Sequence, residues 1–182
     1  LNLSLSNLAN ESNISNTSTF SDIKSHNPVA GLAQKYTFEI NKVVISEGIT
    51  SVGALAFAGC ETLESVVLPI SLIKIGESAF EWSTITGVTI GKNVRKIDDY
   101  AFYFCSSLKT IEFPEGLESI GSSAFAASGL TSVILPDSVT SIGTTAFNNC
   151  TSLTSVKLSA GLTEIAMSTF GKNVNLTSVV IP

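Results

Sequence analysis

Apolar residues return along most of this chain in a unit of 22 or 23 residues. Phenylalanines mark the period, at successive spacings of 23, 22, 23, 22 and 23 residues. They are Phe57, Phe80, Phe102, Phe125, Phe147 and Phe170. A fixed period of this length is typical of a solenoid, whose units stack because each is too small to bury its own apolar side chains. The period therefore predicts an elongated repeat array with one continuous core.

Within each unit, a segment of the form Leu-x-x-Val-x-Leu predicts a short strand, as at Leu153, Val156 and Leu158. Its end alternates, so the Val and the last Leu should point inward and the residue between them outward. A second segment contributes two more apolar columns. These are Ile49, Leu72, Val94, Leu117, Val139 and Leu162, and, three residues later, Val52, Ile75, Ile97, Ile120, Ile142 and Ile165. Gly follows four of these six last residues, which predicts a turn before the buried Ala-Phe pair.

Three cysteines stand three residues after a repeat phenylalanine: Cys60, Cys105 and Cys150. Ser83, Ser128 and Asn173 take the same place in the other units. The position suits a small residue that packs inward and satisfies loop backbone groups. Cysteines two units apart would lie about 10 Å from each other at roughly 4.8 Å per unit, which is beyond disulfide reach. We therefore expect buried free thiols.

The stretch "LTSVILPDSVTSIGTTAFNNCTSL", residues 130–153, resembles the BspA-like leucine-rich repeat, whose pattern runs L-x-x-I-x-I-P-x-x-V-x-x-I-G-x-x-A-F-x-x-C. The resemblance covers residues 40–182. It implies a right-handed repeat solenoid of mostly short parallel β-strands, with loops and turns and little helix. The family is found mostly on bacterial and protist cell surfaces, where members are associated with adhesion to host proteins and to other cells. It brings no family-wide catalytic motif.

The chain divides into two parts by composition. Residues 36–182 form the predicted solenoid of about six repeats, and residues 1–35 are a Ser- and Asn-rich leader or cap. The leader begins with an apolar alternation that is typical of a strand, and residues 29–35 have modest helical character. The triplet Ser18-Thr19-Phe20 repeats Ser168-Thr169-Phe170, so a degenerate repeat is an alternative.

Composition narrows the class of function. A net charge of −5 with 10 Lys and Arg in 182 residues argues against nucleic acid as a partner. The longest apolar run is about five residues, too short for a transmembrane segment. Carboxylates are scattered, and the one histidine, His26, lies in the leader. We therefore expect no enzyme activity, no cofactor and no metal.

The outward positions of the predicted strands form the candidate binding face. We interpret the protein as a non-catalytic, secreted or cell-surface binding or adhesion module that contacts a protein or glycan through this face. The candidate residues are Val44, Val67, Thr89, Ile134, Lys157, Val180, Thr131, Thr154 and Thr177. The plainer interpretation is that Val and Ile are present because they favour strands. The basic residues Lys74, Lys92, Arg95 and Lys96 are expected to form an ordinary solvated face.

An alternative function is self-assembly. A solenoid exposes unpaired strand edges at its first and last units, so copies joined head to tail would form an extracellular filament. The candidate assembly ends are Leu1, Leu3 and Leu5 in the leader, and Leu176, Val179 and Ile181 in the last unit.

Overall fold

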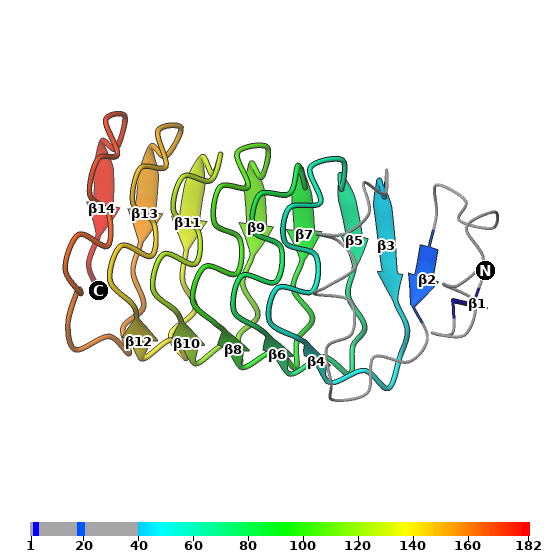
Figure 1. Ribbon diagram of the computed structural model, residues 1–182. Helices are drawn as coiled ribbons and strands as arrows, with labels where there is room; N and C mark the ends of the chain where they lie inside the picture. Colours follow the sequence, from blue (N-terminus) through cyan, green and yellow to red (C-terminus); the bar gives the residue numbers. More distant parts are fainter. Residues whose placement is uncertain (1, 4–17, 21–39) are drawn as a thin grey trace.

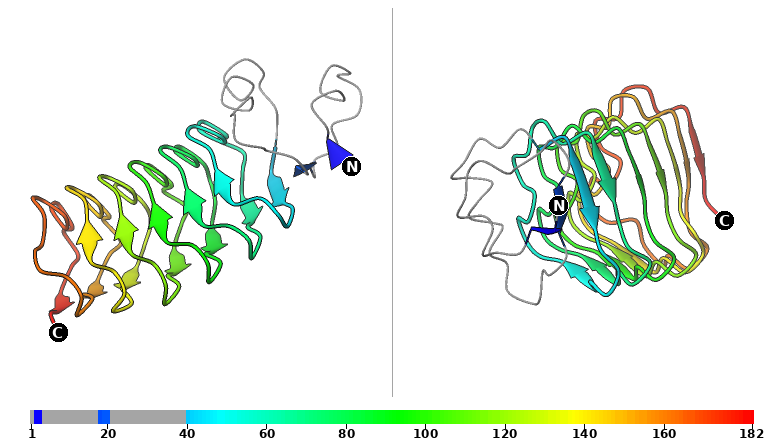
Figure 2. Two further views of the ribbon diagram at one scale, coloured as in Figure 1. Left: turned by 90° about the horizontal axis from the view of Figure 1, so that it is seen from below. Right: turned by 90° about the vertical axis from the view of Figure 1, so that its right-hand side faces the viewer.

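The computed structural model describes residues 2–3, 18–20 and 40–182, and in this part of the chain every regular element is a β-strand. Successive turns of the chain, here called coils, stack side by side into an elongated solenoid (Figure 1). The repeat array that the period predicted is confirmed, and so are the short parallel strands that the resemblance implied. Seen along the stack, the coils superpose and enclose a single interior (Figure 2).

One face of the solenoid is a row of parallel strands, one from each coil. A six-stranded sheet has the order β1-β2-β3-β5-β7-β9, and a three-stranded sheet has the order β11-β13-β14. The amide of Thr131 donates to the carbonyl of Lys109 at 3.2 Å and links the two sheets. The strands are β1 (Asn2–Leu3), β2 (Ser18–Phe20), β3 (Lys42–Ile45), β5 (Ser65–Val67), β7 (Gly87–Thr89), β9 (Thr110–Glu112), β11 (Ser132–Ile134), β13 (Ser155–Lys157) and β14 (Ser178–Val180).

A second sheet of two-residue strands runs along another side of the stack, in the order β12-β10-β8-β6-β4. Each strand ends on the Val or Ile that the repeat pattern placed inward, and all five of these side chains are buried. The strands are β4 (Ser51–Val52), β6 (Lys74–Ile75), β8 (Lys96–Ile97), β10 (Ser119–Ile120) and β12 (Ser141–Ile142).

Strand register confirms the predicted columns. Val43 pairs with Val66, and Val133 pairs with Val156, which pairs in turn with Val179. Because a shift of one residue would turn each strand's inward side chain outward, this register keeps the apolar columns in the core.

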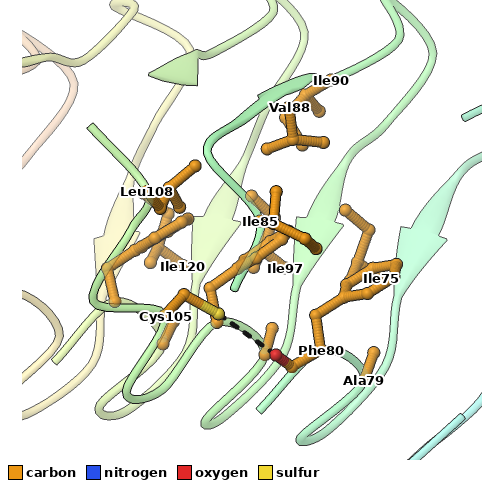
Figure 3. Close-up of a cluster of buried hydrophobic side chains, with 14 of the residues drawn as sticks. Ile75, Ala79, Phe80, Ile85, Val88, Ile90, Ile97, Cys105, Leu108 and Ile120 are labelled. Carbon is orange, nitrogen blue, oxygen red and sulfur yellow. Dashed lines mark hydrogen bonds between the residues drawn. The ribbon is translucent and has the colours of Figure 1, made fainter. Parts of the chain in front are cut away.

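The repeat phenylalanines form a stack along the interior. Neighbouring rings lie 5.2–5.6 Å apart between centroids, with interplanar angles of 5–16°. Five of the six are fully buried, and Phe170 in the last coil is half-buried. Figure 3 shows Phe80 beside Ile75 and Ile97, with Ile85 and Leu108 continuing the same buried cluster, so the predicted shared core is present.

Two residues in each coil adopt a left-handed backbone on the edge that carries the phenylalanines. One lies two residues before the Phe, as in Tyr100 (φ 57°), and the other two residues after it, as in Trp82 (φ 61°). Backbone hydrogen bonds between coils run along this edge, such as Phe80 N–H to the Ala101 carbonyl at 2.8 Å. These bonds satisfy the buried backbone groups, which offsets the cost of the left-handed residues.

The last coil departs from the pattern. Ile165 was expected in the buried column, but it lies outside any strand and is 50% exposed. Its coil packs against a neighbour on one side only, so part of this apolar column has no second surface to cover it. Ala166 follows it where four other coils have Gly.

The leader contributes two short strands to the first sheet. Thr19 pairs with Val44 and Phe20 with Ile45, while Leu3 pairs with Phe20. Phe20 therefore occupies a strand position, whereas Phe170 lies in a turn of its coil; the degenerate repeat stays a prediction. Leu1, Leu5, His26 and the segment 29–35 lie outside the described residues; the division near residue 35 stays a prediction.

Candidate functional site

The row of strands β3, β5, β7, β9, β11, β13 and β14 presents the candidate binding face. Val67, Ile134 and Val180 are 47%, 66% and 51% exposed, whereas Val44 is only half-buried rather than open. Thr89 and Lys157 are also exposed. Pairing places Val44 beside Val67, and Ile134 beside Lys157, which is beside Val180. The predicted column is therefore assembled on one face.

The apolar residues of this column do not form an uninterrupted stripe. Glu112 lies on the coil before Ile134 and Lys157 on the coil after it, so Ile134 stands between two charged side chains. The face is consequently mixed, with isolated apolar side chains among polar ones, as is usual at the rim of a protein interface.

The threonine column has a structural use of its own. The hydroxyl of Thr154 donates to the Thr131 carbonyl at 3.0 Å, and that of Thr177 donates to the Thr154 carbonyl at 3.2 Å. The Thr131 hydroxyl makes a longer bond of 3.4 Å to the Lys109 carbonyl. These hydroxyl protons join neighbouring coils, which leaves the oxygen lone pairs free to accept from a ligand.

The cysteines are buried and free, as predicted. The thiol of Cys105 donates to the Phe80 carbonyl at 3.1 Å (Figure 3), and its sulfur lies 3.2 Å from the Ser83 hydroxyl. Cys150 repeats this arrangement with the Phe125 carbonyl and Ser128. Burial raises the pKa of Cys60 and Cys105 to about 11 and raises that of Cys150 as well, so the thiols stay protonated and unreactive at neutral pH.

The basic cluster is partly neutralised in place. Lys74 and Lys96 sit side by side on β6 and β8 and share Asp98, with N–O distances of 2.6 and 3.1 Å. Arg95 lies 4.0 Å from Glu118 and donates to the Lys92 carbonyl. Because local carboxylates already meet Lys74, Arg95 and Lys96, most of the cluster is ion-paired on a solvated face. Among the described residues, no His, Cys, Asp and Glu side chains gather in a group of three that would hold a metal.

The candidate assembly end in the last coil is open. Val179 and Ile181 are exposed and Leu176 is half-buried. Next to them the Asn173 side-chain amide donates to the Phe147 carbonyl at 2.9 Å, while its buried Oδ1 has no hydrogen-bond partner. At the other candidate end, Leu3 pairs within the sheet.

A surface that the sequence reading missed lies on the turn edge of two adjacent coils. We call it the aromatic edge and define it by Trp82, Tyr100, Tyr103 and Phe104, whose rings touch one another. Trp82 and Tyr100 are 47% and 40% exposed. The available signal was the residue two places after the repeat phenylalanine, which is Gly, Ala, Asn or Lys in the other coils.

Comparison with known proteins places these features in a family. The model for the BspA type leucine-rich repeat region matches six copies over residues 33–141 and 119–182. No curated protein matches this chain. The described part of the chain holds no helix with the length and apolar composition needed to cross a bilayer.

Three solved structures share the fold. The leucine-rich repeat protein TpLRR of T. pallidum is 31% identical, with a TM-score of 0.76, over 91% of this chain and 74% of that one. A leucine-rich cell surface protein of Faecalibacterium prausnitzii A2-165 is 32% identical, with a TM-score of 0.50, over 79% of this chain and 48% of that one. The pneumococcal vaccine antigen PcpA is 19% identical, with a TM-score of 0.57, over 78% of this chain and 51% of that one, and this likeness concerns the fold alone.

The chain spans about half the length of the last two of these proteins. Leucine-rich repeat solenoids generally serve as non-enzymatic scaffolds that bind other proteins through their extended faces. The family model matches repeats over most of this chain, and the strands pair in the register of those repeats. The chain therefore belongs to the BspA-type leucine-rich repeat family.

Proposed function

We propose that this protein is a non-catalytic binding or adhesion module, at the cell surface or secreted, and that it contacts a protein or glycan through the strand face. The observation that carries the proposal is that Val67, Ile134 and Val180 are exposed apolar side chains on one row of parallel strands. Nothing in the packing of the coils requires apolar residues there, because the inward columns already form the core.

The shape of the face also supports binding. The strand row extends along the whole stack (Figure 1), so a partner can contact several coils at once. Extended solenoid faces of this kind bind partners with many weak contacts, among which a few residues contribute most of the affinity. Extracellular exposure accords with the Faecalibacterium neighbour, which is named a cell surface protein.

The test uses charge substitutions on the face. Beads coated with the purified chain are counted after washing on cultured epithelial cells, and Val67→Glu and Ile134→Glu are compared with the parent chain. We expect each to lower bead attachment several-fold, because a carboxylate would be desolvated in the contact. Ile73→Glu is the matched control: Ile73 is 48% exposed and precedes β6 on the second sheet. Attachment that survives both face variants contradicts the proposal.

Head-to-tail self-association is a second candidate function. The buried Oδ1 of Asn173 lacks a hydrogen-bond donor, and the exposed Val179 and Ile181 lie on the same coil. A first coil from another copy would cover these side chains and extend the sheet beyond β14. Sedimentation velocity over a dilution series should then show concentration-dependent growth that Val179→Glu abolishes; a monomer at every concentration rules this candidate out.

A further inference from the structure

The aromatic edge contains a two-ring stack with one ring largely open. Trp82 and Phe104 lie face to face, with centroids 4.1 Å apart and an interplanar angle of 11°. Tyr103 meets Trp82 edge-on at 6.4 Å. Phe104 therefore covers one face of the indole, while the whole Trp82 residue remains 47% exposed.

The open side of the indole looks over Gly59, which holds the same position one coil earlier. Backbone hydrogen bonds establish this alignment: Gly59 N–H donates to the Glu81 carbonyl at 2.8 Å, as Trp82 N–H donates to the Tyr103 carbonyl at 2.9 Å. A Cβ added to Gly59 would meet no atom of the described residues within 4 Å. Among the described residues, the space over Gly59 beside the Trp82 ring is therefore open, and we call it the Gly59 slot.

The fold does not require aromatic rings at this place. Trp82 and Phe104 both have a left-handed backbone, which is unusual for bulky residues. The equivalent residues Ala127, Asn149 and Lys172 show that small or polar side chains serve the same turn. Exposing a stacked indole and phenyl ring here gains nothing in core burial, so their presence points to a ligand.

Charge indicates which ligand. The Glu81 carboxylate accepts a hydrogen bond from the indole Nε1 at 3.1 Å and so lies at the edge of the ring. Glu61 is exposed and follows Gly59 by two residues. The ion pairs of the described residues involve Asp98 and Glu118 instead, and leave both of these carboxylates without a cationic partner. An aromatic face bordered by unpaired carboxylates is complementary to a cation.

We propose that the Gly59 slot binds an arginine side chain of a basic partner protein. The guanidinium is planar, so it can stack on the open indole face and donate to the Glu81 carboxylate at the edge of the ring, while the exposed Glu61 adds negative charge in the neighbouring turn. A lysine ammonium would make the charge contact without the stacking. This surface is separate from the strand face, and it goes beyond the proposed function by naming a second contact and the chemistry of its partner.

Trp82 is the only tryptophan of the chain, so tryptophan-selective fluorescence reports on the slot alone. The probe is a synthetic peptide of five arginines, titrated into the purified chain at low salt. We expect a saturable change in Trp82 emission that weakens as salt rises, because the charged contact is exposed to solvent. A five-lysine peptide should bind about two- to fivefold more weakly, the range expected for an exposed cation–π contact.

Two variants isolate the slot and its charge. Gly59→Asn fills the slot without disturbing the turn, because Asn149 holds the equivalent position at φ 57°; we expect the arginine peptide to bind about fivefold or more weakly. Glu81→Gln keeps an acceptor for the indole N–H but removes the charge, and should also weaken binding. Glu164→Gln, an exposed position in the last coil, removes the same charge away from the slot; it is the control and should leave Trp82 emission and its titration unchanged.

Three outcomes would overturn the proposal. One is the absence of a saturable emission change with the arginine peptide. Another is unaltered affinity in Gly59→Asn, with circular dichroism showing that the variant is folded. The last is a saturable change with a glucan pentasaccharide and none with the arginine peptide, which would assign the slot to a sugar. Because none of these involves the strand face, the result stands apart from that of the bead assay.

Discussion

At the scale of single residues, the position after the inward Ile shows how closely the coils approach. A Cβ added to Gly76 would lie 2.6 Å from the Val52 carbonyl oxygen and 2.9 Å from the Ala54 nitrogen, both in the preceding coil. Asp98 holds the same position one coil later, where its carboxylate pairs with Lys74 and Lys96. In that coil, the position after the inward Ile therefore carries a side chain, and this side chain makes two ion pairs.

We expect Gly76→Ala to destabilise the fold by about 1–3 kcal/mol, because the backbone of the preceding coil must shift to admit the methyl group. Urea unfolding followed by circular dichroism measures this change. Gly87→Ala is the matched control, since the nearest atom to its added Cβ is the Thr110 hydroxyl at 3.7 Å. It should be neutral or slightly stabilising, because a strand glycine loses more entropy on folding than alanine does.

The buried cysteines should make the stability of the fold fall at alkaline pH. Burial raises the pKa of Cys60 and Cys105 from 9.0 to about 11. Above pH 9 the unfolded chain releases these protons while the folded chain keeps them, so stability falls as pH rises from about 9 to 11. Replacing all three cysteines by Ser should remove this part of the pH dependence. Ser is the natural choice because Ser83 and Ser128 occupy the equivalent position in other coils. An unchanged dependence in urea unfolding would contradict the assignment.

At the scale of elements, the phenylalanine stack couples each coil to the next. Phe102 is fully buried between Phe80 and Phe125, at 5.2 Å from each. Phe170 is half-buried and stacks on Phe147 alone. A phenylalanine therefore contributes more to the stability of the fold in a middle coil than in the last one.

We expect Phe102→Ala to lower the free energy of unfolding by about 3–5 kcal/mol, through lost apolar contact and the cavity it leaves. Phe170→Ala should cost roughly half as much, because only one ring covers it. Urea titrations of the two variants measure the difference. Equal losses would mean that the stack does not distribute stability as its burial indicates.

At the scale of the whole molecule, the solenoid is a one-dimensional stack whose coils contact only their neighbours. β9 lies between coils on both sides, whereas β14 pairs only with β13 and all three of its residues are exposed. Local opening should therefore be easiest in the last coil.

Hydrogen exchange followed by mass spectrometry tests this gradient. Amides of Thr110–Glu112 should exchange far more slowly than those of Ser178–Val180 in dilute protein. Protection of β14 that rises with protein concentration would support the head-to-tail candidate. Equal protection of the two strands at high dilution would contradict a stack of weakly coupled end coils.

Much of the fold follows from the sequence because the repeat is a one-dimensional signal. The Phe spacing and the Val and Ile columns specify which side chains point inward, and stacking identical units leaves one register that buries them all. The free, buried cysteines and the outward column of Val67, Ile134 and Val180 could be placed for the same reason. Ile165 could not, because its burial depends on whether a coil follows it and not on its place in the repeat.

Only the tertiary structure decided which side chains lie next to one another on the surface. The register of β2 against β3 placed Phe20 at a strand position, although its triplet matched the Phe-bearing turn. Trp82 and Phe104 are 22 residues apart in sequence, and only stacking of adjacent coils brings their rings to 4.1 Å and, among the described residues, leaves the space over Gly59 open. The periodic pattern determines the interior because every coil must bury the same face. Which side chains meet on the outside depends on the contacts between coils, and no single repeat contains them.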